Sequence, residues 1–335
     1  MKKYIYRIFC GLVPALLILF TTTSCSDDLN YELFTKYTYL LKNGWQGNLA
    51  MNLTEQNTVN LNVPFGVNGS TGNNKDINVT LAVDPDTLKD YNFDKNKNDS
   101  AAYYTILPAD CYQFDKTSYV IPAGQLNAAA TVTVDMTKLA TNYSIYDQYV
   151  LPIKIASSDG EVVGPSKYSR ALYLINLVNN WSGSYSGTGT LTAIYKKKIG
   201  SRYQNITYTG EVSGKQVYAI SNKECYMYAG SYERDTKHHS EFVVKMTMNA
   251  DSTITMESPT NPNFQPIEAN YKFKFTQNST DSRKLNRMTV FHTHYKYVDV
   301  YTDPEITEPY EYEGTLSRND VVYKTDYPDA VISAE

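Results

Sequence analysis

The sequence predicts an all-β protein of two domains. Its 335 residues are enough for about two domains of ordinary size, each with its own hydrophobic core. The 31 tyrosines and 11 phenylalanines favour strands, and a charged fraction of 20% beside them excludes a disordered, collagen-like or coiled-coil chain. Apolar and polar residues alternate over short runs that end in turn residues, which is the pattern of half-buried strands.

Residues 1–24 have the features of a secretory signal peptide. Lys2, Lys3 and Arg7 precede an apolar run of 13 residues, which is shorter than the roughly 20 residues that a membrane-spanning helix needs. Ser24 and Cys25 then resemble the lipobox of bacterial lipoproteins, in which the cysteine is diacylated and becomes the new N-terminus. Cys25 is therefore the predicted lipidation site, and the alternative is a simple secretory signal with an incidental cysteine.

The residues after Cys25 indicate where the protein is expected. Ser26, Asp27 and Asp28 resemble the acidic tag of surface-exported lipoproteins of Bacteroidetes, so we expect an anchor in the outer membrane, facing the cell exterior, and a lipid-anchored linker over residues 25–35. Removal of residues 1–24 leaves 28 basic against 35 acidic residues, a net charge of −7. The lysines at residues 196–198 are the one basic cluster, at the predicted polar end of a hairpin, so nucleic acid is not an expected partner.

A first β domain is predicted over residues 36–178. Apolar and polar side chains alternate along residues 77–83, and Asp84 and Pro85 then predict the cap and first position of a single helical turn that reaches Tyr91. Further strands are predicted at residues 118–121, 130–136, 148–156 and 168–178. Short strands at regular spacing, with no long helix between them, predict a β-sandwich.

A second β domain is predicted over residues 179–335. Eight strands joined by short turns predict an antiparallel meander, either an up-and-down barrel or a two-sheet sandwich. The opening Trp181, Gly183 and Tyr185 resembles the first strand of lipocalin-like barrels, which favours the barrel. The eight strands are predicted at residues 185–195, 204–212, 215–221, 224–229, 241–248, 252–257, 270–277 and 287–301.

Five short runs of the first domain resemble a known family in order and spacing. They lie at residues 79–84, 107–112, 121–124, 132–134 and 149–153. They resemble the Ig-like N-terminal domain of unknown function in Bacteroidetes lipoproteins that are encoded in polysaccharide-utilisation loci. The part from Trp181 onward resembles the C-terminal domain that often follows it. The resemblance implies a place beside an outer-membrane TonB-dependent transporter and its lipoprotein lid, with a role like that of surface glycan-binding proteins.

The sequence offers no catalytic signature. The densest acidic cluster is Glu305, Glu308, Glu311 and Glu313, but flanking prolines and alternating tyrosines indicate a solvated loop and an edge strand, not a pair of glycosidase carboxylates. The motifs of nucleophilic, nucleotide and zinc-protease chemistry do not occur, so no cofactor is expected. The family's N-terminal domain also precedes glycoside hydrolases, yet the second half here is too short and too β-rich for a (β/α)₈ barrel.

The four histidines are candidate metal ligands, and two cysteines are a candidate disulfide. His292 and His294 project from one face of a predicted strand, and His238 and His239 could join them to hold zinc or copper. No cysteine or carboxylate stands beside them at a ligand spacing, so we expect no metal site. Cys111 and Cys225 fall in different predicted domains, where two separate buried thiols are favoured and a disulfide is the alternative.

The excess of aromatic residues is the remaining signal. Sugar rings stack on exposed tyrosine and tryptophan rings, while nearby polar side chains bond the hydroxyl groups. Trp45 and Trp181 stand beside glycines at strand starts and are expected to be core residues. Five tyrosines in polar contexts are the predicted carbohydrate platform, although cross-strand packing is the alternative for each. These are Tyr226, Tyr228, Tyr232, Tyr310 and Tyr312.

These features together predict a non-enzymatic lipoprotein of the outer-membrane surface. It is expected to bind polysaccharide or oligosaccharide and to present it to a TonB-dependent uptake complex. One alternative is a structural or adhesive surface protein of the pilus or matrix type. A second alternative is a glycoside hydrolase or its accessory protein.

Overall fold

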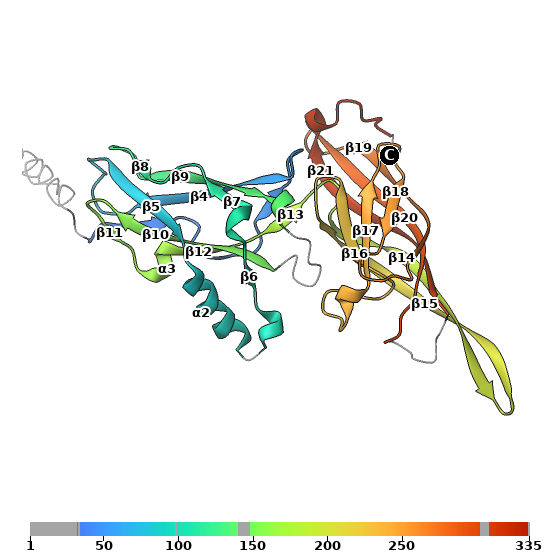
Figure 1. The fold of residues 1–335 in the computed structure, drawn as a ribbon. Helices are drawn as coiled ribbons and strands as arrows, with labels where there is room; N and C mark the ends of the chain where they lie inside the picture. The colour runs from blue at the N-terminus through green and yellow to red at the C-terminus, as the bar shows by residue number, and fades with distance from the viewer. Residues whose placement is uncertain (1–31, 33, 98, 140–147, 302–307, 334–335) are drawn as a thin grey trace, which may run out of the picture.

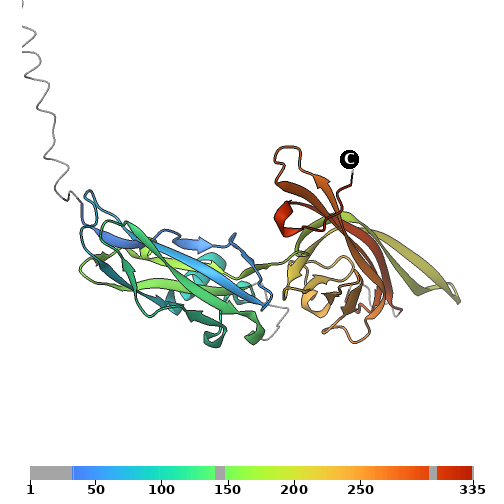
Figure 2. The ribbon, with the colours of Figure 1, turned by 90° about the horizontal axis from the view of Figure 1, so that it is seen from above.

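The protein is all-β, as predicted, and a computed structural model describes its residues 32, 34–97, 99–139, 148–301 and 308–333. Figures 1 and 2 show two domains arranged end to end. The predicted signal peptide, Cys25, most of the predicted linker and Glu305 lie outside the described residues. Within the described ranges, no helix is long and apolar enough to cross a membrane.

The first domain is a sandwich of two sheets. In one sheet the strand order is β11 (Val162–Val163), β1 (Tyr37–Leu40), β4 (Thr58–Val67), β9 (Asn127–Asp135) and β7 (Tyr112–Phe114). In the other the order is β2 (Gly44–Gln46), β12 (Arg170–Leu174), β10 (Tyr149–Ser158), β5 (Ile77–Val83) and β8 (Tyr119–Ile121), with β6 (Thr105–Ile106) beside β10. The pairings are antiparallel except for β1 with β11, β10 with β6 and β12 with β2.

Alternating apolar residues build the core between these sheets. In β4 every second residue from Val59 to Phe65 is buried, and Val132 of β9 and Ile77 of β5 are buried opposite. Full burial of one such side chain contributes about 1.5–3 kcal/mol, so the core follows from the period-two pattern. The predicted strand at residues 77–83 is β5, with the same bounds.

The helix that follows β5 is longer than predicted. The prediction was a single turn capped by Asp84, whereas α2 (Pro85–Asn96) has 12 residues. The Asp84 side chain makes no cap bond to a main-chain N–H of the helix; it accepts from Thr87 Oγ1 at 2.6 Å and from Lys154 Nζ at 2.9 Å. Arg170 Nε lies 3.4 Å away. The other helical segments are short: η1 (Ser100–Ala102), η2 (Ala109–Cys111), η3 (Met136–Lys138), α3 (Ser166–Ser169), η4 (His239–Glu241) and η5 (Lys324–Asp326).

The second domain is one eight-stranded antiparallel sheet that curls into a nearly closed barrel. Its order is β18 (Ile254–Glu257), β17 (Val243–Met248), β16 (Glu224–Tyr228), β15 (Arg202–Ala219), β14 (Gly183–Ile199), β21 (Tyr310–Tyr323), β20 (Lys284–Tyr297) and β19 (Gln265–Gln277). The two end strands approach each other, because Thr253 bridges to Asn270 and Tyr271 N donates to Ser252 O at 2.9 Å. The expected barrel-like meander is therefore present.

Two strand predictions in this domain were wrong. The strands predicted at residues 204–212 and 215–221 form one continuous strand, β15. The acidic segment predicted as a loop and an edge strand contains β21, which pairs with β14 on one side and β20 on the other. Its Tyr310, Tyr312 and Leu316 are buried. Tyrosines and glutamates therefore alternate along β21 because one face of the strand packs inside the barrel, and not because the strand lies at a solvated edge.

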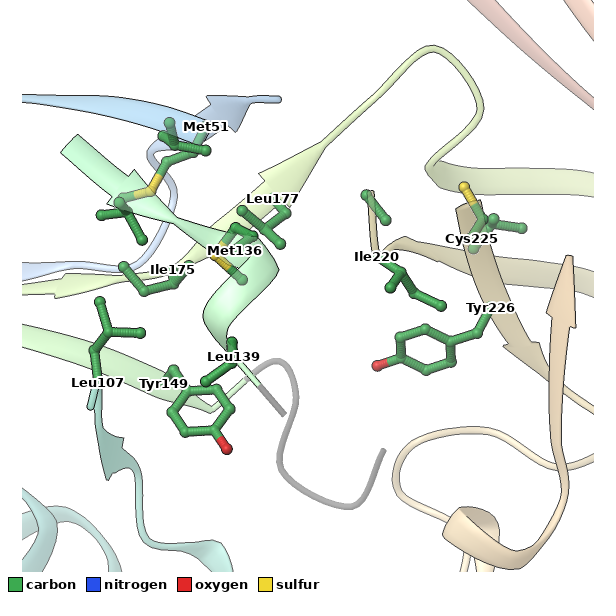
Figure 3. Packing of buried hydrophobic residues seen from close by; sticks show 14 of the residues in the cluster. Met51, Leu107, Met136, Leu139, Tyr149, Ile175, Leu177, Ile220, Cys225 and Tyr226 are labelled. Atoms are coloured by element: carbon green, nitrogen blue, oxygen red, sulfur yellow. The ribbon is translucent and has the colours of Figure 1, made fainter. Parts of the chain in front are cut away.

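The two domains share a continuous hydrophobic cluster. The connector strand β13 (Asn176–Val178) pairs in parallel with β3 (Ala50–Asn52) of the first domain. Figure 3 shows Leu177 of β13 between the first-domain core and Ile220 and Tyr226 of the barrel. A polar contact adds to this packing, since Asn222 N donates to Asn57 Oδ1 at 2.7 Å. Residues of both domains therefore pack against each other at the junction.

Candidate functional site

A polar cleft of about 690 Å³ lies at the domain junction, and we call it the junction cleft. It combines the segment between β3 and β4, the connector after β13, strands β20 and β21, and η5. Its size falls within the range of about 300–1,000 Å³ that is usual for ligand pockets. Its polar lining residues are Asn52, Glu55, Asn179, Asn180, Ser182, Asn222, Arg287, Arg318, Asp320, Tyr323, Asp326 and Tyr327.

Two arginines and one carboxylate form the polar centre of the junction cleft. Arg287 and Asp320 are direct cross-strand partners on β20 and β21, and Arg287 Nη2 donates to Asp320 Oδ2 at 2.9 Å. Arg318, two residues before Asp320 on β21, donates to the same oxygen through Nε at 2.9 Å and Nη2 at 2.7 Å. Two guanidinium groups share this one carboxylate, so the trio carries a positive charge.

Aromatic rings hold the arginines in place. The Arg287 guanidinium lies 5.3 Å from the Phe273 ring centre and 5.4 Å from that of Tyr327, while Arg318 lies 5.3 Å from that of Tyr185. Tyr327 Oη also bonds Arg287 Nη1, and it donates to Asn180 Oδ1 at 2.9 Å. Cation–π contacts and hydrogen bonds therefore fix the direction of both guanidinium groups.

An exposed ring stands at the rim of the junction cleft. The Tyr323 side chain at the end of β21 is 56% exposed, and Lys284 Nζ lies 5.5 Å from its ring centre. Tyr323 and its cross-strand partner Lys284 lie on the outward face of the sheet, whereas Arg287, Arg318 and Asp320 lie on the inward face. An exposed ring can cover the C–H face of a sugar, and polar groups can bond its hydroxyls.

A smaller apolar cavity lies next to the junction cleft. Its volume is about 210 Å³, and it shares Val178, Ser182 and Gly183 with the cleft. Its other walls come from Leu177 of the connector and Val217 of β15. The polar cleft and the apolar cavity are therefore neighbours at the same domain junction.

The five tyrosines of the predicted platform lie inside the barrel domain. Tyr226, Tyr228 and Tyr312 are fully buried, and Tyr310 and Tyr232 are 3% and 4% exposed. A surface platform needs ring faces open to solvent, so the prediction that these five are exposed was wrong. Burial also raises the pKa of Tyr312 to about 12.

Stacking between strands explains this placement. Tyr312 stacks on Tyr295 with ring centres 5.0 Å apart, and the two residues are cross-strand partners. Tyr226 stacks on Tyr218 in the same way at 4.9 Å. Tyr232 stacks on Phe242 at 4.1 Å. The alternative of cross-strand packing therefore describes Tyr312 and Tyr226, whereas Tyr232 lies outside the strands and is covered by Phe242.

Three of the four histidines pair with carboxylates. On the outer face of β20 and β21, His294 Nε2 lies 2.7 Å from Glu311 Oε1, and His292 Nε2 lies 4.0 Å from Glu313 Oε1. The bond from His294 is the main cause that lowers the pKa of Glu311. His238 and His239 lie elsewhere, at the start of η4. His238 Nδ1 lies 3.0 Å from Glu241 Oε1, whereas His239 Nδ1 lies 2.9 Å from the main-chain oxygen of Thr236. The described ranges contain no group of three or more His, Cys, Asp or Glu placed to hold a metal ion.

The cysteines and tryptophans are structural. Cys111 and Cys225 are both free and buried, and burial raises the pKa of the Cys225 thiol to about 12. Trp45 is half-buried and stacks on Tyr91 with ring centres 4.7 Å apart. Trp181 is half-buried against the core and stacks on the Phe273 ring. Both tryptophans pack as core residues, in line with the prediction.

Sequence reasoning missed the residues of the junction cleft. Arg287 occupies an inward position of β20, on the same face as Leu285 and Phe291. A cationic residue at an otherwise apolar position of a period-two pattern indicates a buried charge that needs a partner, and Arg287 shows this pattern in the sequence. The partner Asp320 could not be named, because it lies on another strand.

Two family models match the chain. One is described as an N-terminal domain and matches residues 32–162, and the other is described as a C-terminal domain and matches residues 169–317. The two halves of the chain are thus similar to these two family domains. No curated protein matches it.

Solved structures share this two-domain fold. A multidomain protein including DUF1735 from Bacteroides ovatus is 21% identical with a TM-score of 0.67, covering 88% of this chain and 97% of that one. An auxiliary nutrient binding protein from Bacteroides thetaiotaomicron is 20% identical with a TM-score of 0.66, covering 85% and 94%. A protein of unknown function from Bacteroides ovatus is 20% identical with a TM-score of 0.67, covering 88% and 95%.

Proposed function

We propose that the protein is a non-enzymatic surface lipoprotein that binds polysaccharide in the junction cleft. The observation that carries the proposal is a polar cleft of about 690 Å³ whose lining contains the fixed donors Arg318 and Tyr327 and the exposed Tyr323. The similar fold of an auxiliary nutrient binding protein supports a binding role. In this proposal the donors in the cleft bond sugar hydroxyls, and Tyr323 at the end of β21 stacks on another sugar ring of the same polymer.

The environment of Asp320 favours binding over bond cleavage. Glycoside hydrolysis needs two carboxyl groups, of which one transfers a proton to the leaving group. Asp320 Oδ2 already accepts three hydrogen bonds from Arg287 and Arg318. This carboxylate therefore serves to orient the guanidinium groups, which in turn bond the ligand.

The anchor predicted at Cys25 would hold the protein on the outer membrane, facing outward. Many anchored copies that meet one polymer retain it more strongly than a single site, because the second contact is intramolecular. Captured polysaccharide would then be passed to the TonB-dependent transporter and its lipoprotein lid that the family resemblance implies.

Affinity electrophoresis of the purified two-domain protein tests this proposal. Gels that contain plant, host or microbial glycans should retard the protein for at least one glycan class, relative to a polymer-free gel. Tyr323→Ala should weaken that binding by about 3- to 10-fold, the effect of one lost ring contact. The matched control is Tyr208→Ala, because Tyr208 is 49% exposed but lies on the distant β14–β15 hairpin.

Each result has one interpretation. Retardation that falls for Tyr323→Ala alone supports binding in the junction cleft. Retardation that survives Tyr323→Ala contradicts the cleft as the binding site. An absence of retardation across the whole panel contradicts glycan binding, and self-assembly of the same protein would then favour the structural or adhesive alternative.

A further inference from the structure

The β14–β15 hairpin extends far beyond the barrel. Pairing of β14 with β21 ends at Thr192, and pairing of β15 with β16 begins at Tyr218. Beyond these points the two strands pair only with each other, up to Ile199 and Arg202 next to the turn. Figures 1 and 2 both show this ribbon projecting from the second domain. Seven cross-strand pairs from Ala193 outward give it a length of roughly 23 Å.

The tip of the hairpin carries a concentrated positive charge. Lys196, Lys197, Lys198 and Arg202 are all exposed, and residues 193–210 include no acidic residue. Among the described residues, no carboxylate lies within ion-pair distance of these four side chains. The chain without residues 1–24 has a net charge of −7, so this segment is opposite in sign to the rest of the protein. Such a local field attracts anionic partners that the remaining surface repels.

The two faces of the ribbon differ, because neighbouring residues of a strand point to opposite sides. One face carries Lys196 opposite Asn205 and Lys198 opposite Tyr203, and we call these four residues the cationic face. The Tyr203 ring is 69% exposed. The opposite face carries the other two cations, Lys197 and Arg202, together with Ile199 and Tyr208, which are each 49% exposed.

The cationic face leads into a hollow at the base of the ribbon. This hollow has a volume of about 400 Å³, and its polar lining residues are Thr192, Lys196, Asn205, Gln265, Lys296, Glu308 and Glu311. Lys296 Nζ lies 3.1 Å from Glu311 Oε2. The carboxylates Glu308 and Glu311 are thus confined to the base of the ribbon, and farther out the face carries two cations, an amide and an exposed ring.

We propose that the cationic face binds acidic polysaccharide, a polymer of uronate or sulfated sugars. Lys196 and Lys198 pair with the anionic groups, the Tyr203 ring stacks on a sugar face, and the Asn205 amide bonds hydroxyls. Under the proposed anchor at Cys25 a membrane surface is a poorer fit, because β1 and its partner β11 lie at the end of the first domain away from this hairpin (Figure 1). An acidic protein fits less well, because the exposed Tyr203 ring and the Asn205 amide beside the lysines suit a sugar face and its hydroxyls. This site is separate from the junction cleft and does not depend on it.

The test compares polymers that share a backbone and differ in charge. Polygalacturonate should retard the purified two-domain protein in gels at low salt, and its fully methyl-esterified form at the same concentration should not. Alginate and chondroitin sulfate complete the acidic panel. Retardation should disappear at high salt, because exposed ion pairs are screened.

Variants then locate the site on one face of the ribbon. The double variant Lys196→Gln and Lys198→Gln should weaken binding by about tenfold, and Tyr203→Ala by about threefold to tenfold. Tyr208→Ala is the matched control on the opposite face and should leave the affinity unchanged. Tyr323→Ala should also leave it unchanged, which separates this inference from the proposed function of the junction cleft.

Four outcomes would overturn the inference. They are an absence of retardation by all three acidic polymers, equal retardation by the methyl ester, binding that the lysine double variant retains, and an equal loss for Tyr208→Ala. Competition at equal charge concentration by vesicles of phosphatidylglycerol would identify the hairpin as a lipid-binding element instead. The same competition by poly-glutamate would indicate an acidic protein partner.

Discussion

Arg287 and Arg318 both donate through Nη2 to the main-chain oxygen of Asn180, at 3.2 and 3.1 Å. Asn180 belongs to the connector between the domains, so the two arginines tie this connector to the barrel wall. Both arginines also share Asp320 Oδ2, which makes this carboxylate the centre of the arrangement. The shape of the junction cleft therefore depends on one acidic side chain.

Replacement of this carboxylate should destabilise the protein. Asp320→Ala leaves Arg287, which is 4% exposed, without its ion pair, and loss of one partner of a buried pair costs about 3 kcal/mol. Urea unfolding measures the change in the free energy of unfolding. The control is Asp326→Ala, an exposed carboxylate of η5 that should change it by less than about 0.5 kcal/mol. Equal effects of the two substitutions would show that Asp320 does not hold the arginines.

Two glycines make room for a buried ring in the barrel. A Cβ atom at Gly189 would lie 2.5 Å from the Tyr312 ring, and one at Gly314 would also meet the Tyr312 hydroxyl. Gly189→Ala should therefore destabilise the protein by about 1–3 kcal/mol through overpacking. Gly72→Ala is the control, because nothing lies within 4 Å of a Cβ atom there.

A double-mutant cycle checks that the Tyr312 ring is the cause. Tyr312→Leu should remove most of the penalty of Gly189→Ala, since a smaller side chain leaves space for the added methyl group. Penalties that simply add would mean that the glycine is required for another reason.

The buried tyrosines should make the protein sensitive to alkaline pH. Burial raises the pKa of Tyr218 and Tyr312 to about 12, and those of Tyr295 and Tyr297 well above the usual range. In the unfolded chain tyrosines lose their protons near pH 10, so above this pH the folded state holds more protons. The stabilisation is complete below about pH 10 and falls as the pH rises toward 12, by up to about 1.4 kcal/mol per unit for each tyrosine.

Urea unfolding at pH 8, 10 and 11 measures this dependence. Lys215 acts in the opposite direction, because burial lowers its pKa although Glu233 Oε1 lies 3.0 Å away, but it is a single group. Tyr312→Phe should reduce the slope and cost little at pH 8, since the buried Tyr312 hydroxyl has no hydrogen-bond partner among the described residues. Tyr203→Phe, at a ring that is 69% exposed, is the control. A free energy of unfolding that stays constant above pH 10 would contradict the burial of these rings.

The sequence predicted the local features of the fold and missed part of the pairing. Strand β5 was predicted with its observed bounds, because a buried face and an exposed face leave a clear period of two. Helix α2 was predicted too short, since only Leu88 and Asn92 of its residues are buried and it has no apolar stripe to detect.

The candidate site could not be predicted in the same way. The tyrosines of the predicted platform have polar neighbours in the sequence, yet Tyr312 is buried by Tyr295, which lies on another strand. Arg287 and Asp320 are likewise 33 positions apart and meet only across two strands. The junction cleft also needs the packing of both domains, which no single segment encodes.

Hydrogen–deuterium exchange tests the central claim that glycan binds at the domain junction. The protein is measured with and without saturating amounts of the glycan that retards it in gels. We predict slower exchange in residues 52–55, 178–183 and 318–327, and unchanged exchange at the hairpin for a neutral glycan. Protection confined to other segments, with the junction unchanged, would contradict the assignment of the binding site to this cleft.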